Sequence, residues 1–259
     1  MPFFNFKTKN IHYKTEGSGE AVVLLHGFLE NLSMWDEIAQ ELCKTHQVIR
    51  LNLPGFGKSE CIEGSRSMEL YAVCIHQLLL ELHIDNFTII GHSMGAYAAL
   101  ELSKICPEKI HQLILFHSTA NSDSEQKKKD RDRAIKAVND KKSIYLKTAI
   151  PFLFPEQFQK SCASHIQKMI EEAEALNPKG IIAAIKGMQE RMDNNEILKN
   201  LSCKKSYIAG TLDPLLKIDD LRLESKRNGA DFVEIENSGH MSHWENTKMA
   251  IEEIQKLLS

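Results

Sequence analysis

The sequence predicts an α/β protein with a mostly parallel sheet of eight strands, flanked by helices and interrupted by one helical insertion. Two observations carry this prediction. Short apolar runs that fit buried strands alternate with longer amphipathic segments that fit helices, and this alternation is typical of βαβ units. The alternation stops near Thr119 and resumes at Lys205, and residues 120–200 between them contain only helix-like segments. The insertion is therefore expected after the sixth strand.

The strands define the sheet. Eight segments fit strands: residues 3–7, 11–15, 21–26, 47–51, 87–90, 113–116, 206–209 and 231–235. The third of them is apolar almost throughout, as expected of a strand that is buried on both faces. The interrupted pattern predicts a core of residues 1–119 and 201–259, with residues 120–200 forming a helical cap.

The helices follow from apolar residues at helical spacing. In the alternating part they are expected at residues 33–43, 68–83, 94–106, 215–227 and 244–258, and within the cap at residues 122–142, 155–176 and 178–192. Ser33 is expected to cap the first helix, since a serine hydroxyl accepts a hydrogen bond from a free backbone N–H at that position.

Composition excludes several classes of protein. The chain has 259 residues, 42% of them hydrophobic and 26% charged, which is typical of globular proteins rather than disordered ones. Its net charge of −3 argues against nucleic acid as the main partner, because phosphate binding requires a basic surface. No apolar run approaches the roughly 20 residues of a membrane-spanning helix, and we see no signal peptide.

The six cysteines show no Cys-x-x-Cys pair and no regular spacing. A disulfide framework or a zinc site is the alternative, but free thiols in a reducing compartment fit the spacing better. We therefore expect a cytoplasmic protein. The chain is expected to act as a monomer or homodimer.

The main chemical signal is Gly91-His92-Ser93-Met94-Gly95, which fits the pattern G-x-S-x-G. The motif lies where a predicted strand runs directly into a helix rich in small residues. A turn this tight gives the serine a strained backbone and presents its hydroxyl at the carboxyl end of the sheet. The nearby helix N-terminus then favours a developing negative charge. Ser93 could instead simply cap this helix beside two packing glycines, but the context favours a nucleophile.

Together with this motif, four further segments resemble the α/β-hydrolase superfamily, in particular its small, cap-bearing serine hydrolases and carboxylesterases. In the order found in that family, the segments are Leu24-Leu25-His26-Gly27-Phe28, Leu53-Pro54-Gly55-Phe56-Gly57-Lys58-Ser59, Gly210-Thr211-Leu212-Asp213-Pro214 and Ser238-Gly239-His240. The resemblance spans residues 11–258. One departure is Asn52, where the family often has an aspartate that is structural.

The resemblance implies a Ser-His-Asp triad and an oxyanion hole. Ser93 would be the nucleophile, His240 the general base and acid, and Asp213 the residue that orients the imidazole. The backbone N–H groups of Phe28 and Met94 would form the oxyanion hole. The triad and the oxyanion hole suffice for acyl transfer, so the resemblance implies neither a cofactor nor a metal.

Other residues are alternatives for some of these roles. Asp219 and Asp220 are alternative acids, but they fall inside a predicted helix. His243 could bind a metal with His240, although no carboxylate or cysteine spacing supports such a site. In this family the histidine at position 26 supports its loop, and His92 is expected to point away from the nucleophile.

The cap is expected to shape an apolar pocket, for which His117, Phe152, Phe154 and Met188 are the candidate lining residues. The leading hypothesis is a hydrolase of a small, largely apolar carboxylic ester or thioester, so the expected partner is a small ester-like molecule. Relatives that cleave C–C bonds, or act as lyases in quinone biosynthesis, are an alternative, and so is a small-molecule receptor or signalling protein of the same fold.

Overall fold

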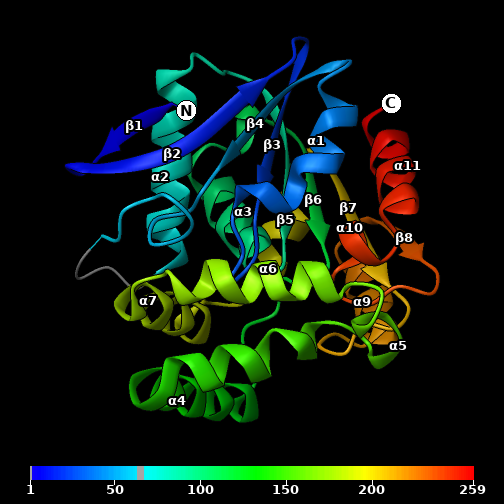
Figure 1. Cartoon of the computed structure of the whole chain (residues 1–259). Helices are drawn as coiled ribbons and strands as arrows, with labels where there is room; N and C mark the ends of the chain where they lie inside the picture. The colour runs from blue at the N-terminus through cyan, green and yellow to red at the C-terminus, as the bar shows by residue number, and fades with distance from the viewer. Residues whose placement is uncertain (1, 63–66) are drawn as a thin grey trace.

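The computed structural model describes residues 2–62 and 67–259 and is organised around one eight-stranded sheet (Figure 1). The strands are β1 (Phe3–Phe6), β2 (Lys9–Glu16), β3 (Glu20–Leu25), β4 (His46–Leu51), β5 (Phe87–His92), β6 (Ile110–Phe116), β7 (Lys204–Gly210) and β8 (Asp231–Ile235). Their order is β1-β2-β4-β3-β5-β6-β7-β8. Strand β2 runs antiparallel to both β1 and β4, and the other adjacent pairs of described strands are parallel. The predicted fold class is therefore confirmed.

Helices cover both faces of the sheet. On one face lie α2 (Met68–Glu81) and α3 (Met94–Ile105), and on the other lie α1 (Asp36–Leu42) and α11 (Thr247–Leu258) (Figure 1). The shorter elements of this part of the chain are η1 (Leu32–Trp35), η2 (Pro107–Lys109), α9 (Ile218–Arg227) and α10 (Ser242–Glu245). Each face has its own buried apolar cluster, and apolar burial of this kind is the main stabilising contribution to the fold.

The residues between β6 and β7 are helical, as the sequence predicts. They form α4 (Glu125–Ala149), η3 (Pro151–Leu153), α5 (Glu156–Gln159), α6 (Ala163–Glu174), α7 (Pro178–Glu190) and α8 (Asn195–Asn200). Helix α4 begins at a cap, where the Ser124 hydroxyl accepts a hydrogen bond from the N–H of Lys127. Helices α4, α6 and α7 lie together beyond one end of the sheet (Figure 1). This end carries the loops that follow the parallel strands.

Several predicted helix boundaries are wrong. Asn31, not Ser33, caps the first helical segment, because the Asn31 side chain accepts a hydrogen bond from the backbone N–H of Ser33. The segment predicted as one helix over residues 155–176 is divided into α5 and α6, and the closing segment over residues 244–258 is divided into α10 and α11. The sequence analysis also missed α8. The predicted end of the charged helix at residue 142 lies next to a kink in α4, since Lys141 has φ −152° and ψ 68°, and a second helical stretch that was not predicted continues to Ala149.

In the described part of the chain, no helix combines the length and the apolar character that crossing a membrane requires.

Candidate active site

Ser93 lies in the turn between β5 and α3, as predicted. Its backbone has φ 48° and ψ −111°, a conformation that a residue with a side chain rarely adopts and that is concentrated at functional sites. Two hydrogen bonds hold the turn: the Ser93 N–H donates to the Phe116 carbonyl at 2.9 Å, and the Ser118 hydroxyl donates to the Ser93 carbonyl at 2.9 Å. The strained turn is therefore fixed from the neighbouring strand.

The two glycines of the motif leave the space that this turn needs. A Cβ atom on Gly91 would lie 2.4 Å from both N and Cα of Ala96, at the start of α3. A Cβ atom on Gly95 would lie 2.5 Å from the carbonyl oxygen of Leu25, at the end of β3. Both distances are far shorter than van der Waals contact, so only glycine lets α3 leave β5 this closely.

The loop after β3 is held by a buried, neutral histidine. His26 Nδ1 lies 2.8 Å from the carbonyl oxygen of Gly27, and His26 Nε2 accepts a hydrogen bond from the N–H of Leu53 at 2.9 Å. Burial lowers the pKa of His26 to about 4, which is consistent with one donating and one accepting nitrogen. The ring therefore ties the loop after β3 to the loop after β4.

Phe28 follows in this loop and borders a cavity that Ser93 also borders, while Met94 is the first residue of α3. Asn52, the departure from the family pattern, has a structural role: its side-chain oxygen accepts a hydrogen bond from the N–H of Leu32 at 2.8 Å.

Asp213 and His240 come from the loops after β7 and β8 and meet at hydrogen-bond distance. Asp213 Oδ2 lies 2.8 Å from His240 Nδ1. The other carboxylate oxygen accepts hydrogen bonds from the backbone N–H groups of Leu215 and Leu216 at 2.8 and 3.1 Å. The carboxylate is thus fixed on both sides and aimed at the imidazole.

Burial alone would raise the pKa of Asp213. The electrostatic interaction with His240 and the contacts with both neighbouring rings outweigh that effect, so the pKa of Asp213 lies below its ordinary value. The rival acid Asp219 lies on α9, where it pairs with Arg222 at 2.6 Å and is 82% exposed. The structure therefore brings Asp213, and not Asp219, to His240.

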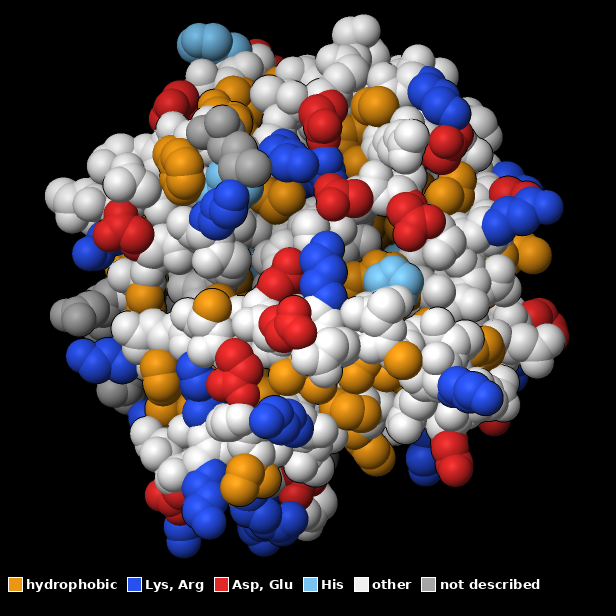
Figure 2. Space-filling view, in the orientation of Figure 1, with side chains coloured by type: hydrophobic (Ala, Val, Ile, Leu, Met, Phe, Trp, Pro, Cys, Tyr) orange, Lys and Arg blue, Asp and Glu red, His pale blue; other side chains and the backbone are white. Residues whose placement is uncertain are grey.

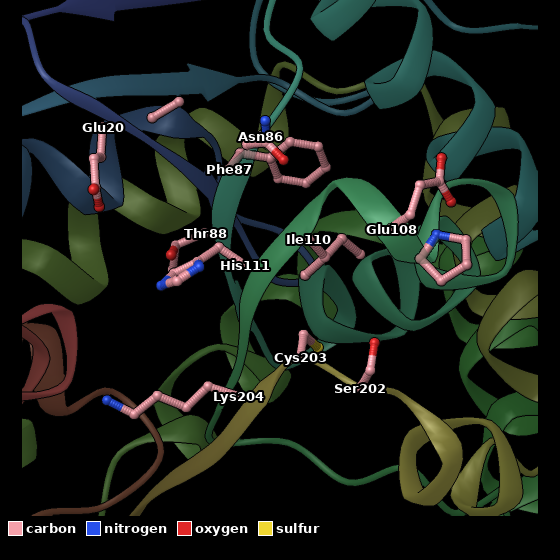
Figure 3. A pocket seen from close by; sticks show the side chains of 12 residues that line it. Glu20, Asn86, Phe87, Thr88, Glu108, Ile110, His111, Ser202, Cys203 and Lys204 are labelled. Carbon is pink, nitrogen blue, oxygen red and sulfur yellow. The ribbon is translucent and has the colours of Figure 1, made fainter.

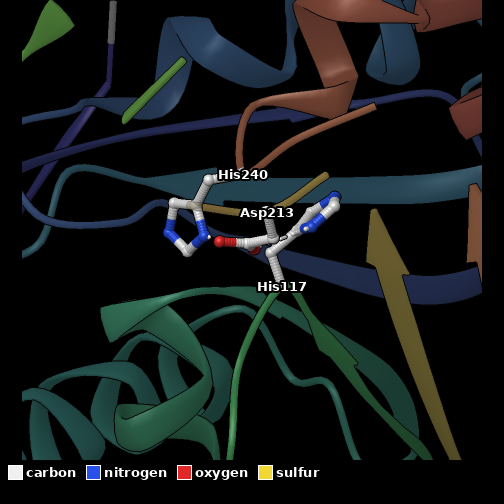
Figure 4. Close-up of side chains that lie close together, drawn as sticks. All are labelled: His117, Asp213 and His240. Carbon is white, nitrogen blue, oxygen red and sulfur yellow. Dashed lines mark hydrogen bonds and ion pairs between the residues drawn. The ribbon is translucent and has the colours of Figure 1, made fainter. Parts of the chain in front are cut away.

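His117 does not line the pocket, which corrects the prediction made for it. It is fully buried behind Asp213, with its Nδ1 3.5 Å from Asp213 Oδ2, so the carboxylate lies between two imidazole rings (Figure 4). His117 Nδ1 accepts a hydrogen bond from the N–H of Gly210 at 3.2 Å, and its Nε2 lies 2.5 Å from the Ser242 hydroxyl. Burial lowers the pKa of His117 to about 4, so the ring is neutral.

The side chain of His92 points into the core, as expected, and there it contacts Glu30. His92 Nδ1 lies 2.8 Å from Glu30 Oε2, and its Nε2 lies 3.0 Å from the backbone oxygen of His240. The same carboxylate oxygen accepts a hydrogen bond from the N–H of Gly27 at 2.5 Å. Glu30 therefore links the loops that carry Phe28, Ser93 and His240, a role that no motif in the sequence signals.

His117, Asp213 and His240 are also the residues whose spacing could hold a metal ion in the described part of the chain. Their ligand atoms all lie within 4.8 Å of one another. In this cluster Asp213 and His240 use the facing atoms for their mutual hydrogen bond, which is the arrangement of an acid–base pair.

A cavity of about 630 Å³ opens between the core and the helical insertion, and both Ser93 and His240 line it. Phe152 and Met188 line it too, which agrees with their predicted positions, and so does Phe28. Phe154 does not: it is 2% exposed and stacks on Trp244, with ring centroids 6.2 Å apart. The prediction for Phe154 is therefore wrong. Lining residues that sequence analysis missed include Tyr97, Lys127, Arg131, Tyr145 and Leu216.

A second cavity, of about 570 Å³, lies at the opposite end of the sheet, where β3, β5, β6 and β7 begin (Figure 3). Its lining includes Glu20, Thr88, His111, Cys203 and Lys204. It shares no lining residue with the cavity beside Ser93.

Comparison with known proteins gives the same family as the motifs. The alpha/beta hydrolase fold family matches residues 20–247. A solved esterase structure from Thermogutta terrifontis is 28% identical, with a TM-score of 0.91, and the match covers 96% of this chain and 93% of that one. The enol-lactonase from Burkholderia xenovorans LB400, at 20% identity and a TM-score of 0.90, shares the fold over 99% of each chain.

Curated relatives match over shorter segments. A 2-hydroxy-6-oxononadienedioate/2-hydroxy-6-oxononatrienedioate hydrolase from Escherichia coli is 33% identical over 117 residues, which is 42% of this chain and 40% of that protein. A pimeloyl-[acyl-carrier protein] methyl ester esterase from Nitrosomonas europaea is 28% identical over 111 residues, or 42% of each protein. The matches thus span less than half the length of these relatives. The family match covers most of the chain, which therefore belongs to the alpha/beta hydrolase fold family.

Proposed function

We propose that this chain is a serine hydrolase that cleaves a small carboxylic ester or thioester through an acyl-enzyme. The observation that carries the proposal is the 2.8 Å contact between Asp213 and His240 beside a cavity that Ser93 also lines. The strained backbone of Ser93 at the start of α3 supports the same assignment. The expected partner is thus a small ester-like molecule, and a cytoplasmic location remains a prediction.

In the proposed reaction, Ser93 Oγ attacks the carbonyl carbon while His240 Nε2 takes the hydroxyl proton. The backbone N–H groups of Phe28 and Met94 stabilise the oxyanion that forms. When the C–O or C–S bond breaks, His240 returns the proton to the leaving alcohol or thiol. A water molecule then attacks the acyl group and gives its proton to His240, and the acid leaves as Ser93 regains its hydrogen.

The pocket supports a substrate with a substantial apolar part. Phe28, Leu29, Phe152, Leu153 and Met188 line the cavity near the proposed nucleophile. Burial of an acyl or alcohol chain against such residues contributes about 0.8 kcal/mol for each methylene group.

Covalent labelling tests the proposal. A fluorophosphonate probe is expected to form a single adduct on Ser93, located by peptide mass, and to leave Ser93→Ala unlabelled. Ser103→Ala is the matched control, because Ser103 is buried within α3 and its hydroxyl donates to Leu100. Absence of labelling in folded wild-type protein would overturn the proposal and favour a small-molecule receptor.

The similarity to the Escherichia coli hydrolase makes C–C bond hydrolysis a second candidate function. The two candidate functions predict different substrates. Turnover of a 4-nitrophenyl ester series would support the ester hydrolase, whereas turnover of a vinylogous 1,5-diketone without ester turnover would support the C–C hydrolase.

A further inference from the structure

The cavity beside Ser93 has two chemically different walls. On the core side, Phe28, Leu29 and Leu215 form an apolar wall beside the polar atoms of Ser93 and His240. Helix α4 forms part of the opposite wall and contributes polar side chains: Lys127, Asp130, Arg131 and Thr148. The Lys and Arg side chains of the described lining, Lys127 and Arg131, both come from α4, so this helix is where the cavity can bind an anionic group of a ligand.

Behind the α4 side of the cavity, positively charged side chains outnumber the carboxylate that they contact. Asp123 is buried, and it contacts two guanidinium groups: Arg131 Nε at 3.0 Å and Arg191 Nη1 at 2.7 Å. The Arg191 guanidinium lies over the ring of Tyr97, 4.0 Å from its centroid, and Tyr97 lines the cavity. One carboxylate thus faces two permanent cations, which leaves a surplus positive charge beside the cavity.

The acidic side chains that line the cavity are already paired. Asp130 lies 2.9 Å from Arg133, which does not line the cavity. Glu30 is held in the core by His92 and the N–H of Gly27. By contrast, no acidic side chain in residues 2–62 or 67–259 forms an ion pair with Lys127. Lys127 therefore adds a second uncompensated charge to this wall.

The net charge of α4 as a whole is also positive. It carries nine Lys and Arg side chains against four Asp and Glu. In the space-filling view, Lys and Arg side chains gather over the lower part of the molecule, where α4 lies (Figures 1 and 2). A positive wall beside a partly enclosed, low-dielectric cavity attracts anions more strongly than an open surface does.

We infer that the substrate carries an anionic group, such as a carboxylate, at the end remote from the cleaved bond, and that Lys127 and Arg131 bind this end. The inference rests on the proposed function and specifies its substrate. The scissile carbonyl would lie at Ser93, the intervening chain against the apolar wall, and the carboxylate at α4.

Matched ester pairs test this inference. On the acyl side the pair is the mono-4-nitrophenyl ester of adipic acid and 4-nitrophenyl hexanoate, and on the alcohol side it is 6-acetoxyhexanoate and hexyl acetate. Wild-type kcat/KM is expected to favour the charged member of at least one pair by about tenfold, which corresponds to about 1.4 kcal/mol. The preference should decrease with ionic strength, because salt screens a partly exposed charge pair.

Variants of Lys127 test whether this residue causes the preference for the charged esters. Lys127→Gln is expected to reduce the ratio of charged to neutral kcat/KM by about three- to tenfold, and Lys127→Arg to retain most of it. Lys129→Gln is the matched control, since Lys129 is exposed on the same helix and does not line the cavity. No preference in either pair, or a preference that Lys127→Gln leaves intact, would overturn the inference.

A binding measurement separates this inference from the proposed function. Ser93→Ala is titrated calorimetrically with monomethyl adipate and with methyl hexanoate, and the anion is expected to bind about tenfold more tightly unless Lys127→Gln is also present. If wild-type Ser93 is not labelled by fluorophosphonate, the proposed chemistry fails, yet the anion preference can still be measured. Equal binding of the two esters together with labelled Ser93 would overturn only the inference.

Discussion

Glu30 Oε2 lies 2.8 Å from Nδ1 of His92, and the two side chains are 1% and 2% exposed. The other ring nitrogen of His92 faces the backbone oxygen of His240 at 3.0 Å, and a carbonyl oxygen can only accept a hydrogen bond. Burial lowers the pKa of His92, but the charge and the hydrogen bond of Glu30 raise it by more than burial lowers it. The pKa of His92 therefore lies above its ordinary value of 6.5. His92 and Glu30 therefore form a buried ion pair that anchors the loop carrying His240.

This pair predicts a pH-dependent loss of stability in Glu30→Gln. Because the pKa of His92 is raised in the folded state, its contribution to stability is fully present below pH 6.5 and is lost as the pH rises through the folded value. The free energy of unfolding of the variant is expected to fall by about 3–5 kcal/mol near pH 6, because the substitution leaves the buried, charged His92 without its partner. The difference from wild type should narrow toward pH 9.

Urea denaturation between pH 6 and pH 9 measures this effect. Glu41→Gln is the control, because Glu41 pairs with Lys44 on the surface and its loss is expected to change the free energy of unfolding by less than about 1 kcal/mol. A loss in Glu30→Gln that does not vary with pH would contradict the ionised state of His92.

The contact between Asp213 and His240 predicts a large effect on turnover from Asp213→Asn. The amide can donate to His240 Nδ1 and stabilise the wrong tautomer, so kcat for 4-nitrophenyl esters is expected to fall by about 10⁴-fold, with KM little changed. Asp219→Asn, an exposed position on α9, is expected to behave as wild type. Similar activity in both variants would remove Asp213 from the proposed triad.

Gly91→Ala tests the turn that presents Ser93. Its Cβ atom would meet Ala96 at 2.4 Å, so α3 must shift and the free energy of unfolding is expected to fall by about 1–3 kcal/mol. Gly229→Ala is the comparison: it has no atom within 4 Å of its Cβ, but its φ of 62° strains alanine by about 1–2 kcal/mol. Fluorophosphonate labelling should be lost in Gly91→Ala alone, whereas labelling of both variants would show that the turn tolerates a side chain.

The sheet and the site loops could be predicted from the sequence because local rules determine them. Alternating apolar segments specify strands and helices, and the G-x-S-x-G motif itself signals the tight turn at Ser93. Gly91 is required by a contact with Ala96, five residues along the chain, whereas the contact that requires Gly95 is with the distant Leu25. Asp213 could be distinguished from Asp219 because the sequence places Asp213 in a loop that follows a strand and Asp219 within a helix. These inferences need no knowledge of how distant helices pack.

The pocket and the buried polar network could not be predicted in this way. Helical periodicity shows that the insertion has an apolar face, but not whether a given side chain meets the cavity or another helix. Phe152 and Phe154 are two residues apart and have opposite environments. Glu30 likewise follows an ordinary loop motif, and its role depends on His92, which is 62 positions away in the chain.

Replacement by alanine should affect different properties at Phe152 and at Phe154. Phe154 is 2% exposed and stacks on Trp244, so Phe154→Ala is expected to reduce the free energy of unfolding by about 3–5 kcal/mol. Phe152 is 63% exposed and lines the cavity, so Phe152→Ala should change stability by no more than about 0.5 kcal/mol.

In a 4-nitrophenyl ester series of increasing acyl length, Phe152→Ala is instead expected to flatten the rise of kcat/KM with chain length. The reason is that each methylene group that loses apolar contact forfeits up to about 0.8 kcal/mol. Urea denaturation and the ester series are measured on the same preparations, so that unfolded protein cannot mimic a loss of specificity. If Phe152→Ala is as destabilised as Phe154→Ala and keeps the wild-type dependence on chain length, Phe152 belongs to the core and the cavity is bounded by other side chains.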